Sequence, residues 1–260
     1  VQASDGYYYY GISENGMVVA SPYRVNTVDP NTTGIRKGVR ISKERYNSKR
    51  ALFNDGNSRS ASGLSTGAFN NIVIYLKFSD DTDFIIPRQD YDNKFNLPEG
   101  NSLKSYFHEV SYSKLTIHST HLPESDAMAN QSYTDAHPRS YFEPYNATTN
   151  PSGYTDEPDR RLREHTLVKD AVEWLNTNSP VPANLNIDSD DDGKIDNISF
   201  IVRGNNSVWS GLLWSHKWAL GSFNVYMNNK QVWNYIFVPE SQASVTTICH
   251  EMFHTLGAPD

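Results

Sequence analysis

The chain has 260 residues, a formal net charge of −7 and a sequence pI near 5.6. This length fits one large domain, or one domain with a small appendage, and it is ample to bury a core. Apolar runs are short, as in Ile72 to Leu76, whereas a membrane span needs about 20 residues. The acidic balance argues against binding to a phosphate backbone, so we expect no nucleic-acid partner and no transmembrane segment. A single cysteine, Cys249, excludes an internal disulfide and an all-cysteine metal cluster.

The first part of the chain differs in pattern from the rest. Residues 7–12 and 17–20 flank Asn15-Gly16, and Asn-Gly predicts a tight hairpin turn. Residues 54–63 are rich in Gly, Ser and Asn, which is typical of a flexible connector. We therefore expect a small β-rich unit with its linker over residues 1–66 and a second domain over residues 67–260. Between hairpin and connector lie seven basic residues, which form either a solvated face or an accessible, cleavable join: Arg36, Lys37, Arg40, Lys43, Arg45, Lys49 and Arg50.

After the connector the pattern becomes α/β. Apolar runs and period-two alternation predict strands at residues 71–78, 114–121, 198–202, 212–218 and 232–238. Apolar residues at helical spacing predict helices at residues 102–111, 159–176 and 243–256. We expect Asp159 to cap the middle helix and Leu162 to lie on its apolar stripe. The segment 131–157 shows no periodicity and is interpreted as a long insertion.

The last helix carries the strongest chemical signal, the sequence His250-Glu251-Met252-Phe253-His254. Two histidines four positions apart lie about 40° from each other around a helix, so both imidazoles can reach one metal ion. Glu251 is placed beside the metal without having to bind it, which suits a base that takes a proton from metal-activated water. We therefore predict His250 and His254 as zinc ligands and Glu251 as the catalytic residue.

The third zinc ligand is expected at the end of the chain. Gly257 allows the chain to leave the helix and Pro259 prevents the helix from continuing. The turn can bring Asp260 back to the metal, which gives three protein ligands and one open position, as in catalytic zinc sites. A glutamate further along the chain, as in thermolysin-like enzymes, is the alternative.

These motifs resemble the immune inhibitor A family of secreted zinc metallopeptidases, which are metzincin-like. The resemblance covers most of residues 70–260, and the order of its sequence blocks makes it specific. The blocks are Asn71–Asp81, Ser105–Ile117, Asp190–Asn197, Leu213–Trp218 and the final HExxHxxGxPD.

The resemblance implies a zincin-like, metzincin-type α/β catalytic domain with a twisted mixed sheet and an active-site helix, preceded by a prosegment. It implies His250, His254 and Asp260 as zinc ligands, Glu251 as acid and base, and endopeptidase activity on protein or peptide substrates. It also implies a secreted, cell-surface or periplasmic protein. No signal peptide is visible at the start of the chain, so the protein is either cytosolic or has lost its leader. Metzincin-like enzymes continue into a methionine turn, so we expect the catalytic domain to be truncated after the active-site helix. We expect a monomer.

A second cluster of candidate ligands is the acidic loop at residues 188–196. Carboxylates at its positions 1, 3, 5 and 9 with glycine at position 6 match the hard-cation loop of an EF-hand. Position 12 is Ser199 instead of a bidentate glutamate, so we expect a calcium loop of another type that leads into a strand. A solvated acidic turn without an ion is the alternative. The predicted Ca²⁺ ligands are Asp188, Asp190, Asp192 and Asp196.

Trp214 and His216 are predicted to belong to an edge strand that pairs with an extended substrate. The alternative is a packed strand with a hydrogen-bonded histidine. Cys249 is expected to be a buried small residue and not a zinc ligand.

The favoured function is a secreted zinc-dependent endopeptidase, made as a zymogen if residues 1–66 inhibit it. The alternatives are a calcium-stabilised cell-surface binding module with an inert or structural zinc site, and a zinc hydrolase of other substrates. Turnover of a protein substrate separates these functions, whereas calcium-dependent melting does not.

Overall fold

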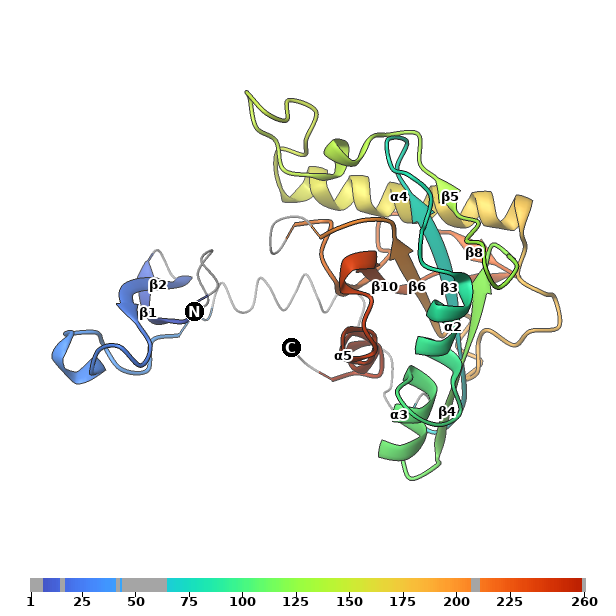
Figure 1. Cartoon of the computed structure of the whole chain (residues 1–260), viewed down its shortest axis with the longest axis horizontal. Helices are drawn as coiled ribbons and strands as arrows, with labels where there is room; N and C mark the ends of the chain where they lie inside the picture. Colours follow the sequence, from blue (N-terminus) through green and yellow to red (C-terminus); the bar gives the residue numbers. More distant parts are fainter. Residues whose placement is uncertain (1–6, 15–16, 41–42, 44–64, 207–210, 259–260) are drawn as a thin grey trace. The chain divides into compact units, whose positions relative to one another are not determined.

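A computed structural model describes residues 7–14, 17–40, 43, 65–206 and 211–258 (Figure 1). The chain divides into two compact units, residues 1–58 and residues 59–260, and each is described by itself. The sequence pattern places this boundary at residue 66.

The first unit contains the predicted hairpin. Strand β1 (Tyr9–Glu14) pairs antiparallel with β2 (Met17–Arg24). A single 3₁₀ turn, η1 (Pro30–Thr32), follows and is capped by the side chain of Asp29. The turn residues Asn15 and Gly16, three of the seven basic residues (Arg45, Lys49 and Arg50) and the connector lie outside the described residues.

The second unit is a mixed α/β domain built on a six-stranded sheet. The strand order is β4 (Leu115–Leu122), β3 (Gly67–Lys77), β6 (Asn197–Val202), β10 (Asn234–Pro239) and β7 (His216–Ala219), and β5 (Tyr133–Thr134) pairs with the end of β3. The strands run parallel except β7, which is antiparallel to β10 and ends this strand order. A small separate hairpin joins β8 (Tyr226–Met227) and β9 (Lys230–Gln231).

Helices cover both faces of the sheet (Figure 1). One face packs against α4 (Glu157–Asn178), whose buried residues include Leu167, Val168 and Val172. The other face packs against α2 (Arg88–Asn96), α3 (Leu103–Val110) and α5 (Val245–Thr255). Two short 3₁₀ turns, η2 (Arg139–Phe142) and η3 (Glu240–Gln242), complete the described elements.

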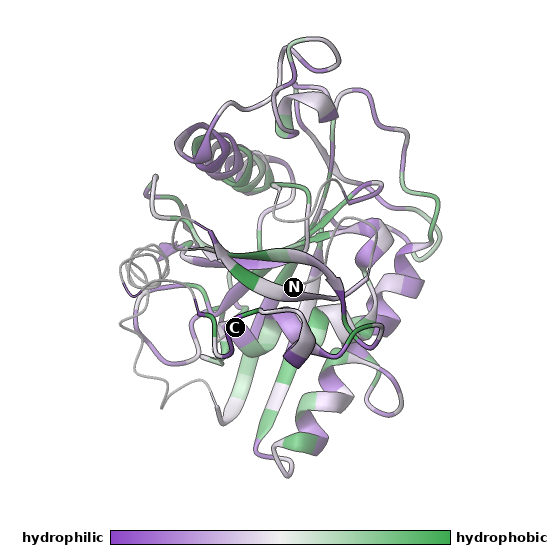
Figure 2. Cartoon of the chain, turned by 90° about the vertical axis from the view of Figure 1, so that its left-hand side faces the viewer, coloured by the Kyte–Doolittle hydropathy of each residue, from purple (hydrophilic) through white to green (hydrophobic). Residues whose placement is uncertain are grey.

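The hydrophobic pattern explains these layers. Alternate residues of β3 belong to opposite cores, with Ile72 and Ile74 on the α4 side and Val73 and Tyr75 on the α5 side. A strand buried on both faces therefore appears in the sequence as a continuous apolar run. In Figure 2 the long helix seen nearly end-on is hydrophilic on its outer side and hydrophobic toward the sheet.

The expected helix at residues 159–176 is longer, because its cap is Asp156 and not Asp159. The Asp156 side chain accepts a hydrogen bond from the Asp159 amide, at 2.9 Å. Leu162 is 53% exposed and not part of the buried stripe, which includes the polar residues Glu164 and His165 instead.

The two last expected strands are displaced. Leu212 and Leu213 are buried but precede β7, which starts at His216. The final strand starts at Asn234 rather than residue 232, although Val232 is itself buried. Burial alone therefore does not identify the residues that join the sheet.

Candidate functional site

Helix α5 presents the HExxH residues on two of its sides. The helix begins after Ser244, whose hydroxyl accepts a hydrogen bond from the Thr247 amide. Ile248 and Met252 pack into the core beneath the sheet, while His250 is exposed and His254 is half-buried. Glu251 lies between the two histidines in sequence and is only 5% exposed.

The two imidazoles face each other. The Nε2 atoms of His250 and His254 are 3.2 Å apart, and the ring planes are nearly perpendicular, at 88°. The Nδ1 atom of His254 lies 3.0 Å from the carbonyl oxygen of Ala258. Because a carbonyl only accepts hydrogen bonds, Nδ1 carries the proton in the neutral ring, and the lone pair of Nε2 points toward His250. The chain reaches Ala258 through Gly257, whose φ of 101° favours glycine.

This spacing fits a zinc ion. Two nitrogens at 2.0–2.1 Å from a tetrahedral ion are roughly 3.3–3.4 Å apart. The distance between the two Nε2 atoms is close to that value. Among the described residues no further His, Cys, Asp or Glu completes a three-ligand group with this pair. The predicted third ligand, Asp260, and the preceding Pro259 lie outside the described residues.

An ion pair near Glu251 joins the edge strand β7 to α4, between His216, whose side chain is 22% exposed, and the fully buried Glu164. Nε2 of His216 is 2.7 Å from Oε1 of Glu164, and Nδ1 is 2.6 Å from the carbonyl oxygen of Trp214. The hydroxyl of Tyr235 donates to the same Glu164 oxygen, at 2.5 Å. Both ring nitrogens of His216 therefore face acceptors, which requires the doubly protonated, charged ring.

The electrostatics agree with this charge state. Burial alone would lower the pKa of His216, but the charge of Glu164, its hydrogen bond and the charge of Glu251 together raise it. Burial alone would raise the pKa of Glu164, which is fully buried, but the His216 cation and its hydrogen bond hold that pKa below its ordinary value. Glu164 was not predicted from the sequence, although a glutamate inside the apolar stripe of a helix is a usable signal of a buried partner.

The predicted substrate contacts, Trp214 and His216, differ in how each is held within the protein. The ring of His216 is engaged on both nitrogens, so a substrate would have to displace Glu164 or Trp214 to bond to it. The side chain of Trp214 is half-buried and its backbone holds His216. Strand β7 has β10 as its sheet partner and lies at the end of the strand order of the described sheet.

The acidic loop brings three of its four predicted ligands together. Asp188, Asp190 and Asp196 each place a carboxylate oxygen within 4.8 Å of the others. Asp192 is not part of this group: its side chain is exposed and accepts a hydrogen bond from the Lys194 amide, at 2.8 Å. Asp192 occupies the tip of the turn, where Asp191 and Gly193 adopt positive φ angles of 54° and 84°.

Donors already contact two of the three carboxylates. Asp188 accepts from the amides of Asp192 and Gly193 and from Nζ of Lys230, at 2.7 Å. Asp196 accepts from the Asn70 amide and from both the amide and hydroxyl of Ser189. Asp190 differs, because its Oδ1 is buried and has no hydrogen-bond partner. The three carboxylates and the single ammonium group of Lys230 leave a local excess of negative charge, which favours the binding of a cation.

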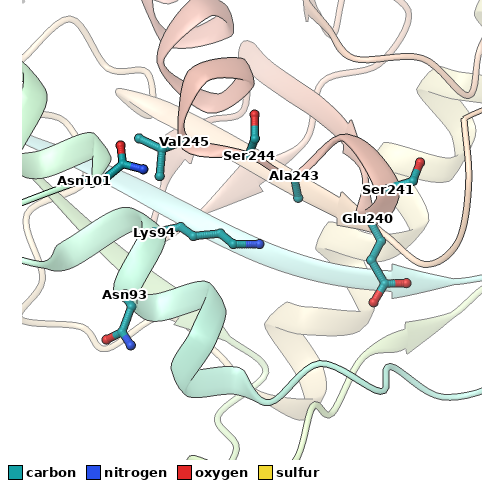
Figure 3. Close-up of a pocket in the computed structure, with 8 residues that line it drawn as sticks. All are labelled: Asn93, Lys94, Asn101, Glu240, Ser241, Ala243, Ser244 and Val245. Atoms are coloured by element: carbon teal, nitrogen blue, oxygen red, sulfur yellow. The ribbon is translucent and has the colours of Figure 1, made fainter.

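A separate cavity of about 410 Å³ lies beside the start of α5 (Figure 3). Lys94 extends from α2 toward the segment that leads into α5. Glu240 is held by the hydroxyl of Tyr91 and by Arg203, so its carboxylate is engaged. The cavity is at the opposite end of α5 from His254, and its lining is Asn93, Lys94, Asn101, Glu240, Ser241, Ala243, Ser244 and Val245.

Comparison with known proteins assigns no relationship to this chain. No protein-family model matches the sequence, and no curated protein is similar enough to count as a match. None of the described helices is both long and apolar enough to cross a membrane.

Proposed function

We propose that the chain is a zinc-dependent endopeptidase of the metzincin type that acts outside the cytosol and resembles the immune inhibitor A family. The observation that carries the proposal is the pair of imidazoles on α5, whose Nε2 atoms are 3.2 Å apart, with Glu251 on the same helix. In the proposed site His250, His254 and Asp260 hold the ion.

The bound ion would act as a Lewis acid on the scissile carbonyl and lower the pKa of a water molecule toward about 7. Glu251 would accept the proton of that water and deliver it to the leaving amine. The low exposure of Glu251 keeps bulk water from competing for this proton. The hydrogen bond from His254 Nδ1 to the Ala258 carbonyl holds the ring with Nε2 toward His250.

An extended peptide is the substrate form that we propose. The outer edge of β7 can pair with such a peptide through backbone hydrogen bonds, as in other cases of strand addition. In this arrangement His216 supports the strand from inside and Trp214 lies two residues before its start. We propose residues 1–66 as the prosegment.

The test compares three samples of the full-length protein after removal of the prosegment: the unaltered protein loaded with zinc, Glu251→Gln loaded with the same amount of zinc, and the unaltered protein with a chelator. Using fluorescently labelled casein, we expect turnover only in the first, with a loss of about 10²–10⁴-fold in Glu251→Gln. Glu109→Gln is the matched control, because Glu109 is an exposed helical glutamate. Equal turnover in all samples would overturn the proposal.

A calcium-stabilised binding module is the second candidate. The unpartnered, buried Oδ1 of Asp190 inside the acidic group favours it. If calcium raises the melting temperature while zinc-loaded protein shows no turnover of casein, this second function replaces the first.

A further inference from the structure

A buried polar ladder crosses the sheet beneath the end of α5. Ser119, Asn71 and Asn197 are register partners on the adjacent strands β4, β3 and β6. Their neighbours on the same face, such as Val73 and Ile201, belong to the apolar core below α5. Polar residues therefore replace apolar ones at one level of this face.

The ladder is fully hydrogen-bonded among the described residues. Asn71 donates to the hydroxyl of Ser119, at 3.1 Å, and its Oδ1 accepts from Asn197 Nδ2, at 2.8 Å, and from the hydroxyl of Ser199, at 2.9 Å. Asn197 Nδ2 also donates to Ser199, at 3.1 Å. No side-chain atom of these four residues is among the buried groups that lack a partner. Such a connected network favours one arrangement of its members.

The ladder reaches the zinc helix through Thr255. The Thr255 hydroxyl donates to Oδ1 of Asn197, at 3.2 Å, and both residues are buried. Thr255 is the last residue of α5 and directly follows His254. It also lies four positions after Glu251, on the same side of the helix.

A helix that packs only through apolar contacts can slide or rotate at small cost, because the hydrophobic effect is not directional. The start of α5 is fixed by the Ser244 cap and by Glu240, which binds Tyr91 and Arg203. The hydrogen bond between Thr255 and Asn197 adds a directional contact at the other end, where His254 and the turn through Gly257 lie.

We propose that Thr255 and Asn197 are positioning residues that hold the end of α5 in the rotation at which the two imidazoles meet a common ion. The inference rests on the proposed zinc site and adds residues that neither bind the metal nor touch the substrate. The Thr255 hydroxyl holds the end of α5 through its hydrogen bond to Asn197, and the ladder in turn holds Asn197 in place.

The experiment uses the full chain and three variants. Thr255→Val removes the hydroxyl and keeps the shape, Thr255→Ser keeps the hydroxyl, and Thr246→Val changes an exposed threonine of the same helix as the matched control. Zinc affinity is measured by calorimetric titration with Zn²⁺, and ligand geometry by the visible absorption spectrum after Co²⁺ addition. Melting in the presence of a chelator measures the stability of each metal-free variant.

We expect Thr255→Val to bind Zn²⁺ about 10-fold more weakly and to change the Co²⁺ spectrum, as supporting residues of metal sites commonly do. Thr255→Ser should keep both the Zn²⁺ affinity and the Co²⁺ spectrum of the unaltered chain, and Thr246→Val should match the unaltered chain as well. If Thr255→Val lowers the melting temperature but leaves Zn²⁺ affinity and the Co²⁺ spectrum unchanged, the role of Thr255 is structural and the inference is wrong. If the unaltered chain binds no Zn²⁺, the proposed function fails first and the inference fails with it.

Discussion

The two candidate metal sites of this chain differ in how far the protein itself satisfies the ligand atoms. On α5 the Nε2 atoms of His250 and His254 face each other, with Nδ1 of His254 bonded to Ala258. In the acidic loop, Asp188 and Asp196 already accept hydrogen bonds from backbone amides, a hydroxyl and Lys230. In the first site two ring nitrogens face each other at a spacing that suits zinc, whereas in the second the protein already supplies donors to every carboxylate except that of Asp190.

The largest effect that separates the two sites is expected from His254→Ala. If the ligands of a zinc site share an apparent 10–16 kcal/mol, loss of one ligand costs about 3–4 kcal/mol, or roughly 10²–10³-fold in affinity. Calorimetric titration with Zn²⁺ measures this loss. Calcium binding should be unchanged.

The control for His254→Ala is His108→Ala, because His108 is an exposed histidine on α3. An equal loss of zinc affinity in both variants would mean that zinc binds to surface histidines and would contradict the assignment.

The acidic loop is tested by the contrast between Asp190 and Asp192. Saturating calcium, at about 100 times its dissociation constant, should stabilise the unaltered chain by about 2.7 kcal/mol. Asp190→Asn should lose this gain because the unpartnered carboxylate oxygen is replaced, and Asp192→Asn should keep it because Asp192 lies outside the group. Urea unfolding with and without calcium measures both. Loss of the gain in Asp192→Asn alone would contradict the arrangement.

The smallest expected effect is a dependence of stability on pH that comes from the pair of His216 on β7 and Glu164 on α4, which is separate from the acidic loop. The pKa of Glu164 is lowered from 4.5, so its contribution is present above pH 4.5 and is lost as the pH falls further. The pKa of His216 is raised from 6.5, so its contribution is complete below pH 6.5 and is lost as the pH rises through the raised value. The pair therefore stabilises the fold most between these two values.

Urea unfolding of the unaltered chain and of Glu164→Gln between pH 5.5 and 8.5 measures how the contribution of this pair to stability changes with pH. The unaltered chain should lose more stability than the variant as the pH rises. Parallel curves would show that His216 is not charged in the folded protein.

The elements of the domain were largely predictable because their hydrophobic periodicity is strong. The buried strands and the amphipathic α5 follow from runs such as Ile72 to Leu76 and from the spacing of Ile248 and Met252. The start of α4 was predicted wrongly because Asp156 and Asp159 both suit a helix cap, and only the backbone geometry distinguishes them. The sequence does show that the imidazoles of α5 share one side, since this depends on helical spacing alone.

Contacts between distant segments were not predictable in the same way. Glu164 meets His216 across 52 positions, and Thr255 meets Asn197 across 58. In the sequence each of these residues is only a polar residue within an apolar pattern. Its partner is determined by the arrangement of the folded elements around the sheet. The ion pair of His216 with Glu164 was not predicted for this reason, and the substrate-binding role of Trp214 and His216 stays a prediction.

X-ray absorption at the zinc edge measures the ligands of the proposed zinc site directly, using the full chain loaded with one equivalent of Zn²⁺. The proposed site predicts a four-coordinate first shell of nitrogen and oxygen at 2.0–2.2 Å, with the outer-ring scattering of two imidazoles. That imidazole signal should fall to one ring in His254→Ala. A shell made of oxygen atoms alone, or one with two imidazoles in both proteins, would contradict it.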